Sequence, residues 1–523
     1  MTSVLTPGDT CWRRERAERA AFLVDTEAYF TAVFDALQKA RRSVILLGWG
    51  FDPRTRLFPD GYDGPDDPDE VGRILVELAR ARPELDIRIL IWRSAFAIAA
   101  QQEFFPHKAR EWFKGTGVKF RLDDSVPFGA CHHQKVLVID DRVAFCGGGD
   151  IAVDRWDTAR HPDHDPRRIM PDQEYHAPRH EVMMVVDGPV AVALGEHCRE
   201  RWRRATGEVL EAPEDAGGDP WPEHVPPTLI GVDVAIARTE PEWKKRPLVD
   251  EIRRLTLACI AEARETIYLE NQYFTSPLIT EALAARLTEP EGPEVVLIST
   301  GQAPSWFDRA TMDRARGAMI WRLRAADIFG RLRAFWPATS GGKTVIVHSK
   351  TSVFDDRIAR VGSANLNNRS GGFDTECELC VECDAEGEAQ AESRLAIMAF
   401  RDRLVGHFMG CTGDAVAKAR ADFGGLGPAI DALNRDGRLR PIEPPAVSAF
   451  GEFVAHYHLG DPQDTRDAWN PFRRRERLYT AVREMQVLAA PEEPPPLIGE
   501  ADEAAVGVTT SPGTVRAPRS RNP

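Results

Sequence analysis

Apolar segments alternate with helical segments along the chain. Residues 42–51, RSVILLGWGF, form a continuous apolar run that ends in glycine and aromatic residues, which predicts a buried strand. Residues 70–82 carry apolar side chains at helical spacing, and residues 86–95 read as a second strand. Strand, helix and strand in succession are typical of an α/β layered fold.

The same pattern restarts in the second half of the chain. Strands are predicted at 135–140 and 142–148, and then residues 205–229, rich in Pro, Gly and acidic side chains, indicate a linker or long surface loop. The elements predicted after this segment are helices at 248–263 and 311–335 and strands at 266–274, 294–300, 344–355 and 357–366. The restart indicates two domains of similar type.

A length of 523 residues also favours two domains. The pattern divides the chain into an N-terminal extension (1–40), a first α/β domain (41–204), a linker (205–245), a second α/β domain (246–487) and a tail (488–523). The tail is rich in Pro, Glu, Ala and Thr and poor in aromatic residues, which predicts disorder.

Charge and hydropathy narrow the class of protein. The formal net charge of −14 argues against a nucleic-acid-binding surface, which is usually basic. We find no apolar run of about 20 residues and no apolar core of a secretory signal at the N-terminus, so a cytoplasmic protein with transient, peripheral membrane contact is expected.

Nine cysteines in a chain of this length do not suggest a disulfide scaffold. Cys377, Cys380 and Cys383 have a spacing that also occurs at metal sites, but their segment reads as a strand. Residues three apart on a strand point to opposite faces, which favours buried structural cysteines. No metal and no cofactor are expected.

An internal repeat carries the candidate chemistry. His133 and Lys135 are followed after four residues by Asp140 and after six more by Gly147 and the turn GGGD. The second copy has the same spacing: His348, Lys350, Asp355 and then the turn GSAN at 362–365. One such motif is weak evidence, whereas two copies in the same register are strong evidence for a shared site.

The spacing places one imidazole beside one ammonium group in each copy, because residues two apart on a strand share a face. Two such pairs suit a phosphodiester. One imidazole can attack phosphorus and the other can protonate the leaving oxygen and then activate water. Lys135 and Lys350 can hold the non-bridging oxygens, and donors at Ser363 and Asn365 can add hydrogen bonds to the phosphate. Asp150 ends the first turn at the position of Asn365 and is counted with these residues as a candidate to bind the phosphate or to support the groups that do.

Carboxylates are expected to support the imidazoles. Glu181 and Glu376, each on a strand after its Gly-rich turn, are candidates to orient a histidine, although a surface position suits Glu181 equally well. Asp140 and Asp355 complete the motif and are included among the candidate catalytic residues, although their places at strand ends also suit fixing a turn.

These motifs resemble the phospholipase D superfamily, whose hallmark is a pair of HxKxxxxD sequences. Residues 132–157, 178–191, 267–274 and 348–376 further resemble blocks of the phosphatidylcholine-hydrolysing eukaryotic enzymes, so the resemblance covers roughly residues 40–410. It implies two α/β/α sandwich domains related by a pseudo-twofold, with the active site at their interface. It also implies that His133 is the nucleophile and His348 the acid and base.

The resemblance leaves several functions open. The first is hydrolysis of a glycerophospholipid such as phosphatidylcholine, or head-group exchange with an alcohol, by a covalent phosphohistidine route. A cardiolipin-synthase-like phosphatidyltransferase is the alternative, and a nuclease is disfavoured by the acidic charge. The expected partner is a phospholipid at a membrane surface, with no nucleic acid. Because both motifs lie in one chain, a monomer suffices for an active site. The aromatic residues 306, 307, 321 and 336 either line an acyl-binding mouth or pack as ordinary helix residues.

Overall fold

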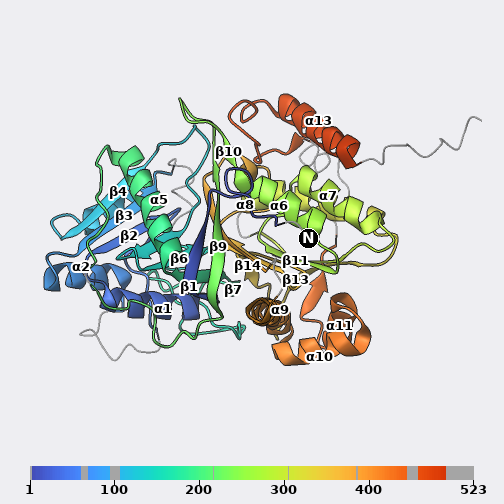
Figure 1. The fold of residues 1–523 in the computed structure, drawn as a ribbon, viewed down its shortest axis with the longest axis horizontal. Helices are drawn as coiled ribbons and strands as arrows, with labels where there is room; N and C mark the ends of the chain where they lie inside the picture. Colours follow the sequence, from blue (N-terminus) through green and yellow to red (C-terminus); the bar gives the residue numbers. More distant parts are fainter. Residues whose placement is uncertain are drawn as a thin grey trace, which may run out of the picture.

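A single large sheet runs through the centre of the protein in the computed structural model (Figure 1). The structure describes residues 3–59, 69–94, 106–215, 217–303, 306–383, 387–443 and 457–489. Within these ranges, the strand order from one edge to the other is β18-β13-β12-β11-β15-β16-β17-β9-β1-β8-β6-β5-β2-β3-β4, and β10 pairs with β9.

The two halves place equivalent strands in the same order, counted outwards from the central pair of β1 and β9. The first half contributes β1 (Arg13–Val24), β2 (Ser43–Gly48), β3 (Asp86–Trp92), β4 (Val118–Asp123), β5 (Val136–Ile139), β6 (Val143–Gly147) and β8 (Val182–Asp187). The second half contributes β9 (Leu229–Glu240), β11 (Thr266–Asn271), β12 (Glu294–Ile298), β13 (Leu332–Pro337), β15 (Lys350–Phe354), β16 (Ile358–Gly362) and β17 (Glu376–Glu382), with β10 (Val249–Asp250) and β18 (Leu439–Pro441) at its margins.

Matching strands also have matching directions. β2, β3 and β4 are parallel, as are β11, β12 and β13, and the remaining pairs of the main path are antiparallel. The two halves meet where β1 pairs antiparallel with β9. This arrangement confirms the expected fold class of two α/β halves related by a pseudo-twofold.

Helices cover both faces of the sheet. α5 (Pro189–Thr206) and α9 (Glu388–Met409) share one apolar core that crosses the junction between the halves. On the other face, α1 (Thr26–Lys39), α2 (Val71–Ala81) and α4 (Pro106–Trp112) cover the first half, and α6 (Glu251–Glu262), α7 (Pro277–Thr288) and α8 (Trp306–Ala326) cover the second. α2 shows why: Val71, Ile74, Leu75 and Leu78 are buried along one helical stripe.

A short helix, η1 (Arg369–Gly371), lies between β16 and β17. The chain after α9 adds α10 (Gly413–Phe423), α11 (Leu426–Leu433) and α13 (Pro471–Ala489). None of the helices in the described residues is long and apolar enough to cross a membrane.

The domain boundaries need correction. Residues 1–40 are not an extension, because they contain β1, the central strand of the first half, and α1. Residues 205–245 contain β9, its partner across the junction, so only 207–228 connect the halves. β1 was missed because its first residues, RRERAER, are charged and only its end is apolar.

Two further expectations concern the C-terminal half. The helix predicted for 311–335 ends at Ala326, and the last of these residues enter β13. The tail predicted to be disordered (488–523) begins within α13 and from residue 490 lies outside the described residues.

Candidate active site

Short parallel pairings bring the two motif regions together. β7 (Arg179–His180) pairs with β14 (Ile346–Val347), so the next residues in register are Glu181 and His348. At the equivalent place, His132 forms a bridge with Thr375, and the next residues are His133 and Glu376. Each histidine is therefore placed beside a glutamate from the other half of the chain.

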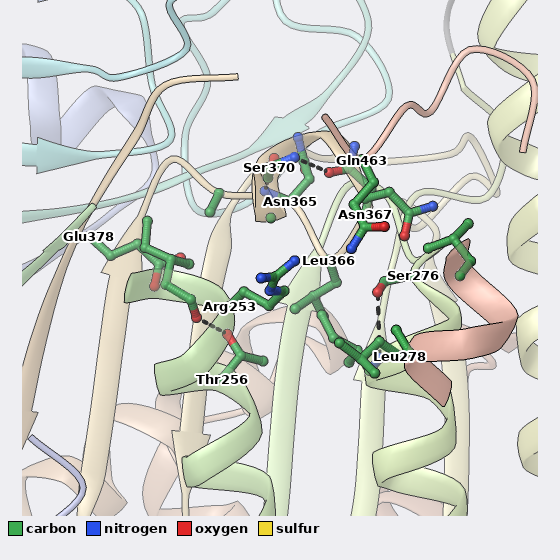
Figure 2. Close-up of a pocket in the computed structure, with 17 residues that line it drawn as sticks. Arg253, Thr256, Ser276, Leu278, Asn365, Leu366, Asn367, Ser370, Glu378 and Gln463 are labelled. Carbon is green, nitrogen blue, oxygen red and sulfur yellow. Dashed lines mark hydrogen bonds between the residues drawn. The ribbon is translucent and has the colours of Figure 1, made fainter. Parts of the chain in front are cut away.

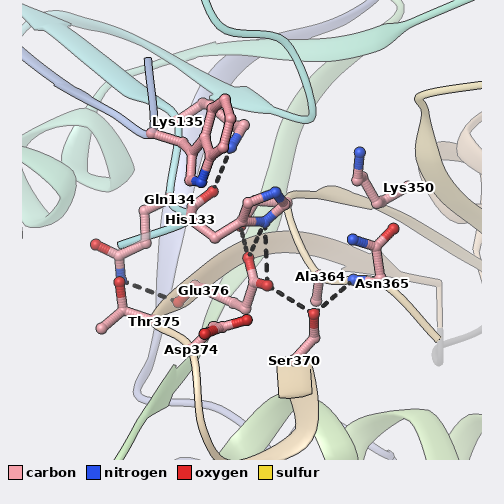
Figure 3. Close-up of polar contacts among 12 residues, drawn as sticks. His133, Gln134, Lys135, Lys350, Ala364, Asn365, Ser370, Asp374, Thr375 and Glu376 are labelled. Atoms are coloured by element: carbon pink, nitrogen blue, oxygen red, sulfur yellow. Dashed lines mark hydrogen bonds and ion pairs between the residues drawn. The ribbon is translucent and has the colours of Figure 1, made fainter. Parts of the chain in front are cut away.

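The pair of His133 and Glu376 is held by a network of hydrogen bonds (Figure 3). Nδ1 of His133 lies 3.1 and 3.0 Å from the two carboxylate oxygens of Glu376. Hydroxyls of Ser363 and Ser370 donate to the same carboxylate at 2.5 and 2.7 Å. Burial raises the pKa of Glu376 to about 8. Burial, together with the charges of Lys135 and Lys350, lowers the pKa of His133 well below its usual value.

His348 lies closer to Glu181 than His133 does to Glu376, and fewer hydrogen bonds hold the Glu181 carboxylate. Nδ1 of His348 lies 2.6 Å from the Glu181 carboxylate, whose other oxygen accepts a hydrogen bond from the amide of Val182 at 3.1 Å. Burial raises the pKa of Glu181 to about 7. Burial and the charge of Lys350 lower the pKa of His348 well below its usual value. In both pairs the Nδ1 position is taken, which leaves Nε2 for a substrate.

The two lysines face different neighbours. Each ammonium donates to the backbone carbonyl of its own motif histidine, at 2.7 Å for Lys135 and 2.5 Å for Lys350. Lys135 also pairs with the Asp150 carboxylate at 3.3 Å, whereas Lys350 lies 3.5 Å from the amide oxygen of Gln272. Burial lowers the pKa of Lys350 to about 7, and the charge of Lys135 acts in the same direction. The second lysine therefore gives up its proton far more readily than an exposed lysine.

The Gly-rich turns also differ between the halves. A Cβ atom on Gly148 would lie 2.4 Å from a carboxylate oxygen of Glu181, so this position requires glycine for close approach. The equivalent Ser363 instead supplies a hydroxyl to Glu376. Asp150 accepts hydrogen bonds from the amides of Trp49 and Gly50 at the end of β2, at 2.9 and 3.1 Å.

Asn365 occupies the position in the second turn that Asp150 has in the first. Its amide oxygen is buried without a hydrogen-bond partner. Its side chain lies beside Lys350 (Figure 3). The NH2 group of the same amide can donate to a phosphate oxygen.

Asp140 and Asp355 do not belong to the site, which corrects their place among the catalytic candidates. The carboxylate of Asp140 accepts hydrogen bonds from three successive amides, 41–43, at 2.7–2.8 Å. Asp355 does the same with the amides 264–266 at 2.7–3.2 Å. These amides precede β2 and β11, whereas the site lies roughly 20 Å away at the other ends of these strands. Both aspartates therefore anchor strand starts.

Two contributors were not predicted from the sequence. Ser370 lies in η1 and Gln272 follows β11, so neither belongs to the repeated motif. The only sequence signal for Gln272 is its position inside the block 267–274 that resembles the family. The neighbouring His132 is structural, because its ring nitrogens contact Thr375 at 3.1 Å and Asp123 at 3.0 Å.

A small cavity, partly open to solvent, lies behind the second turn. Figure 2 shows Asn365 and Ser370 on its wall, with Leu278 and Leu366 across from them. The cavity thus adjoins residues of the Glu376 network and has a largely apolar lining.

Two family comparisons cover the two halves. The family described as "Phospholipase D" matches residues 36–216, and the family described as "Cardiolipin synthase, PLD-like domain" matches residues 256–396. Each match contains one of the two motifs and the glutamate that serves the other half. The chain belongs to the phospholipase D superfamily.

Individual superfamily members match at low identity. Phospholipase D2 of Bos taurus is 24% identical over 476 residues, covering 71% of this chain and 50% of the relative. Phospholipase D A of Dictyostelium discoideum is 23% identical and covers 73% of this chain and 35% of the relative. This chain therefore spans about half or less of the length of these two relatives. Among solved structures, a phosphatidylserine synthase of Haemophilus influenzae Rd KW20 matches with a TM-score of 0.49 at 13% identity, covering 80% of this chain and 95% of that one.

Proposed function

We propose that this protein is a phospholipase D-type enzyme that cleaves glycerophospholipids through a covalent phosphohistidine intermediate. The observation that carries the proposal is the crossed arrangement of two histidine–glutamate pairs with two lysines. Each imidazole is fixed at Nδ1 by a buried carboxylate and presents Nε2. Such a pair of imidazoles provides a nucleophile and a proton donor for the same phosphodiester.

In the first step, the Nε2 lone pair of His133 forms a bond to phosphorus. The bond from phosphorus to the head-group oxygen breaks, and that oxygen takes the Nε2 proton of His348. The lowered pKa of His133 favours the neutral, nucleophilic ring. The anionic phosphodiester stabilises the protonated form of His348 once it is bound, and Glu181 stabilises the same charge at Nδ1. The two lysines neutralise charge on the non-bridging oxygens.

In the second step, neutral His348 removes a proton from water or from an alcohol. The oxygen of that molecule attacks phosphorus, the phosphorus–nitrogen bond to His133 breaks, and its electron pair returns to the imidazole. Water yields phosphatidate, and an alcohol yields a new phosphodiester. The assignment of His133 as the nucleophile follows the superfamily resemblance.

An exposed aromatic pair supports a membrane-borne substrate. Phe128 and Trp469 are 76% and 71% exposed, and their ring centroids lie 5.4 Å apart. Phe128 precedes His133 by five residues, on the segment that leads into the site. The carbonyl of Gly129 in that segment accepts a hydrogen bond from Arg369, next to Ser370. Exposed aromatic rings beside an active site suit insertion among lipid head groups.

The aromatic residues nominated from the sequence give a mixed result. Trp321 on α8 is 65% exposed, whereas Trp336 on β13 is partly buried against the core and lies under Arg440. The side chains of Trp306 and Phe307 lie outside the described residues.

The deciding experiment uses phosphatidylcholine vesicles with a few per cent of a primary alcohol. Wild type is expected to release choline and to form phosphatidate and phosphatidyl-alcohol, and His133→Ala and His348→Ala are expected to form none. Phosphatidyl-alcohol requires an intermediate that an alcohol can intercept. An inert wild type on phosphatidylcholine and on other glycerophospholipids would refute the lipid assignment and make nucleic acid the next substrate to test.

The role of the aromatic pair is tested separately. Phe128→Ser and Trp469→Ser are expected to lower turnover of phospholipid in vesicles at least tenfold but to preserve turnover of a water-soluble phosphodiester. Trp321→Ser removes another exposed tryptophan and serves as the matched control, which should retain both activities. Equal losses on vesicles and soluble substrate would exclude a membrane-docking role for the pair.

A phosphatidyltransferase is the second candidate, supported by the match of residues 256–396 to the family described as "Cardiolipin synthase, PLD-like domain". In the vesicle assay, phosphatidylglycerol replaces the primary alcohol as the acceptor. Preferential formation of a diphosphatidyl product over phosphatidate would favour the transferase. Phosphatidate as the dominant product would favour hydrolysis.

A further inference from the structure

A second cluster of titratable side chains lies beneath the active site and takes no part in the chemistry above. Asp25, His161, His180 and His407 each place one possible metal-ligand atom within 4.8 Å of the others. Asp25 connects β1 to α1, His161 follows β6, His180 lies on β7 and His407 lies in the last turn of α9. The side chains of all four are at most 6% exposed.

Carboxylates outside the cluster orient two of the imidazoles. Nδ1 of His161 lies 2.9 Å from Asp157, so its Nε2 points to the centre of the cluster. Nε2 of His180 lies 2.9 Å from Glu270, so its Nδ1 points to the same place. A carboxylate on the far nitrogen is the usual companion of a metal-binding histidine, because it fixes the ring and makes the near nitrogen a better donor.

The ligand atoms have the separations of a coordination shell. Nε2 of His407 lies 2.9 Å from Nε2 of His161 and 3.4 Å from Oδ2 of Asp25, and all the ligand atoms lie within 4.8 Å of one another. Tetrahedral ligands at about 2.0–2.1 Å from Zn²⁺ lie about 3.3 Å from one another. The shortest separation would need to open by about 0.4 Å to hold the ion.

An unsatisfied atom points to a missing ligand. Oδ2 of Asp25 is buried and has no hydrogen-bond partner, although Oδ1 accepts hydrogen bonds from His180 at 2.8 Å and from the amide of Glu181 at 3.3 Å. A buried carboxylate oxygen without a donor is costly. A cation between Oδ2 and the two Nε2 atoms would satisfy all three at once.

We propose that Asp25, His161 and His407 bind one divalent transition-metal ion of the Zn²⁺ type, through Oδ2, Nε2 and Nε2. Nδ1 of His180 donates a hydrogen bond to Oδ1 of Asp25 at 2.8 Å, so His180 holds the carboxylate rather than the ion. Two imidazoles and a carboxylate form a donor set that Zn²⁺ prefers over Mg²⁺ or Ca²⁺.

The ion would act as a structural link rather than a reagent. His407 belongs to the second half, whereas Asp25 and His161 belong to the first. Asp25 also holds the backbone of Glu181 on both sides, since its amide donates to the Glu181 carbonyl at 2.8 Å. The ion would therefore fix the glutamate that orients His348.

Metal content of tag-free protein tests the proposal. Wild type is dialysed against Zn²⁺, then against metal-free buffer, and analysed by elemental mass spectrometry. About one equivalent is expected in wild type and in the control His197→Asn, which loses a buried imidazole bonded to Gln134 outside the cluster. The double variant His161→Asn/His407→Asn should retain less than about a tenth of that amount. A wild type that retains no more Zn²⁺ than the double variant would show a hydrogen-bonded network only and overturn the proposal.

A second measurement does not depend on the folding of any variant. Metal-free wild type is titrated with Co²⁺ and Zn²⁺ separately. Absorption bands of four- or five-coordinate Co²⁺ and a rise of a few degrees in melting temperature with Zn²⁺ are expected. Neither depends on catalytic activity, so the result stands whether or not the protein cleaves phospholipids. Absence of both the bands and the temperature shift would overturn the proposal.

Discussion

The two halves of the active site hold equivalent residues by different means. Glu376 is supported by two hydroxyls and contacts His133 with both oxygens, whereas Glu181 has one short contact with His348 and lies against a glycine. Lys135 has a carboxylate neighbour and Lys350 has an amide. The pseudo-twofold thus fixes positions but not chemistry, which allows one half to act as nucleophile and the other as acid and base.

The largest effect is expected from the glutamates. Glu181→Gln and Glu376→Gln are each expected to lower kcat by roughly 10³–10⁴-fold, because an amide cannot stabilise the imidazolium charge or fix the same tautomer. The measurement is kcat on vesicles, with circular dichroism as the control for folding. A loss under tenfold in either variant would mean that its histidine does not depend on the glutamate from the other half.

A smaller effect is expected when the first turn is given the residue of the second. Gly148→Ser adds a Cβ atom that would lie 2.4 Å from a carboxylate oxygen of Glu181, so the glutamate must move. Displacement of an orienting group by about 1 Å costs on the order of 10²-fold in kcat. Gly149→Ser is the comparison variant, because its Cβ would also meet Glu181 but at 3.1 Å, so a smaller displacement and a smaller loss are expected. Similar activity in the two variants would contradict a special need for glycine at 148.

The difference between the lysines predicts a pH effect. Lys350 must be protonated to hold phosphate, so activity is lost as pH rises through its pKa of about 7. Gln272→Glu would give it a carboxylate neighbour, as Lys135 has in Asp150, and would raise that pKa. The alkaline limb of kcat/KM should therefore move upward by about one pH unit. Gln272→Leu is the control, because it adds no charge and should not move the alkaline limb of kcat/KM upward. If the alkaline limb does not move in Gln272→Glu either, Lys350 is excluded as the titrating group.

The smallest effect concerns stability. Ser370→Ala removes a donor from the buried Glu376 carboxylate and should lower the free energy of unfolding by about 1–3 kcal/mol. Because the folded-state pKa of Glu376 is raised to about 8, its contribution to stability is present at acid pH and is lost as pH rises from about 4.5 to 8. Loss of the hydroxyl should deepen this decline, as measured by urea unfolding at pH 5 and pH 8. An equal loss of unfolding free energy at both pH values would mean that Ser370 contributes by packing and not by its hydrogen bond to Glu376.

Local patterns were sufficient to predict much of this protein. Apolar runs located the strands around both motifs, and the repeat singled out the two histidines and the two lysines. The strands after the Gly-rich turns offered Glu181 and Glu376 as candidate partners, although a surface position suited Glu181 equally well. The strand at 376–382 was also predicted, with Cys377 and Cys380 in different cores on its two faces. These features depend on residues close together in the sequence.

Features that depend on distant pairing were not predicted. Each glutamate orients the histidine of the other half because β7 pairs with β14 and His132 forms a bridge with Thr375. No local sequence pattern indicates these long-range pairings. Asp140 has the spacing of a catalytic residue, and only its contacts with amides 41–43 reveal that it anchors a strand. The Phe128–Trp469 pair joins segments far apart in the chain.

The crossed pairing also sets the time at which the site first exists during synthesis. His133 and Glu376 are 243 residues apart. At about 5–20 residues per second, the ribosome adds the glutamate roughly 12–50 s after the histidine. Throughout that interval His133 lacks the carboxylate that orients it. A growing chain therefore carries no complete active site until most of its sheet has been made.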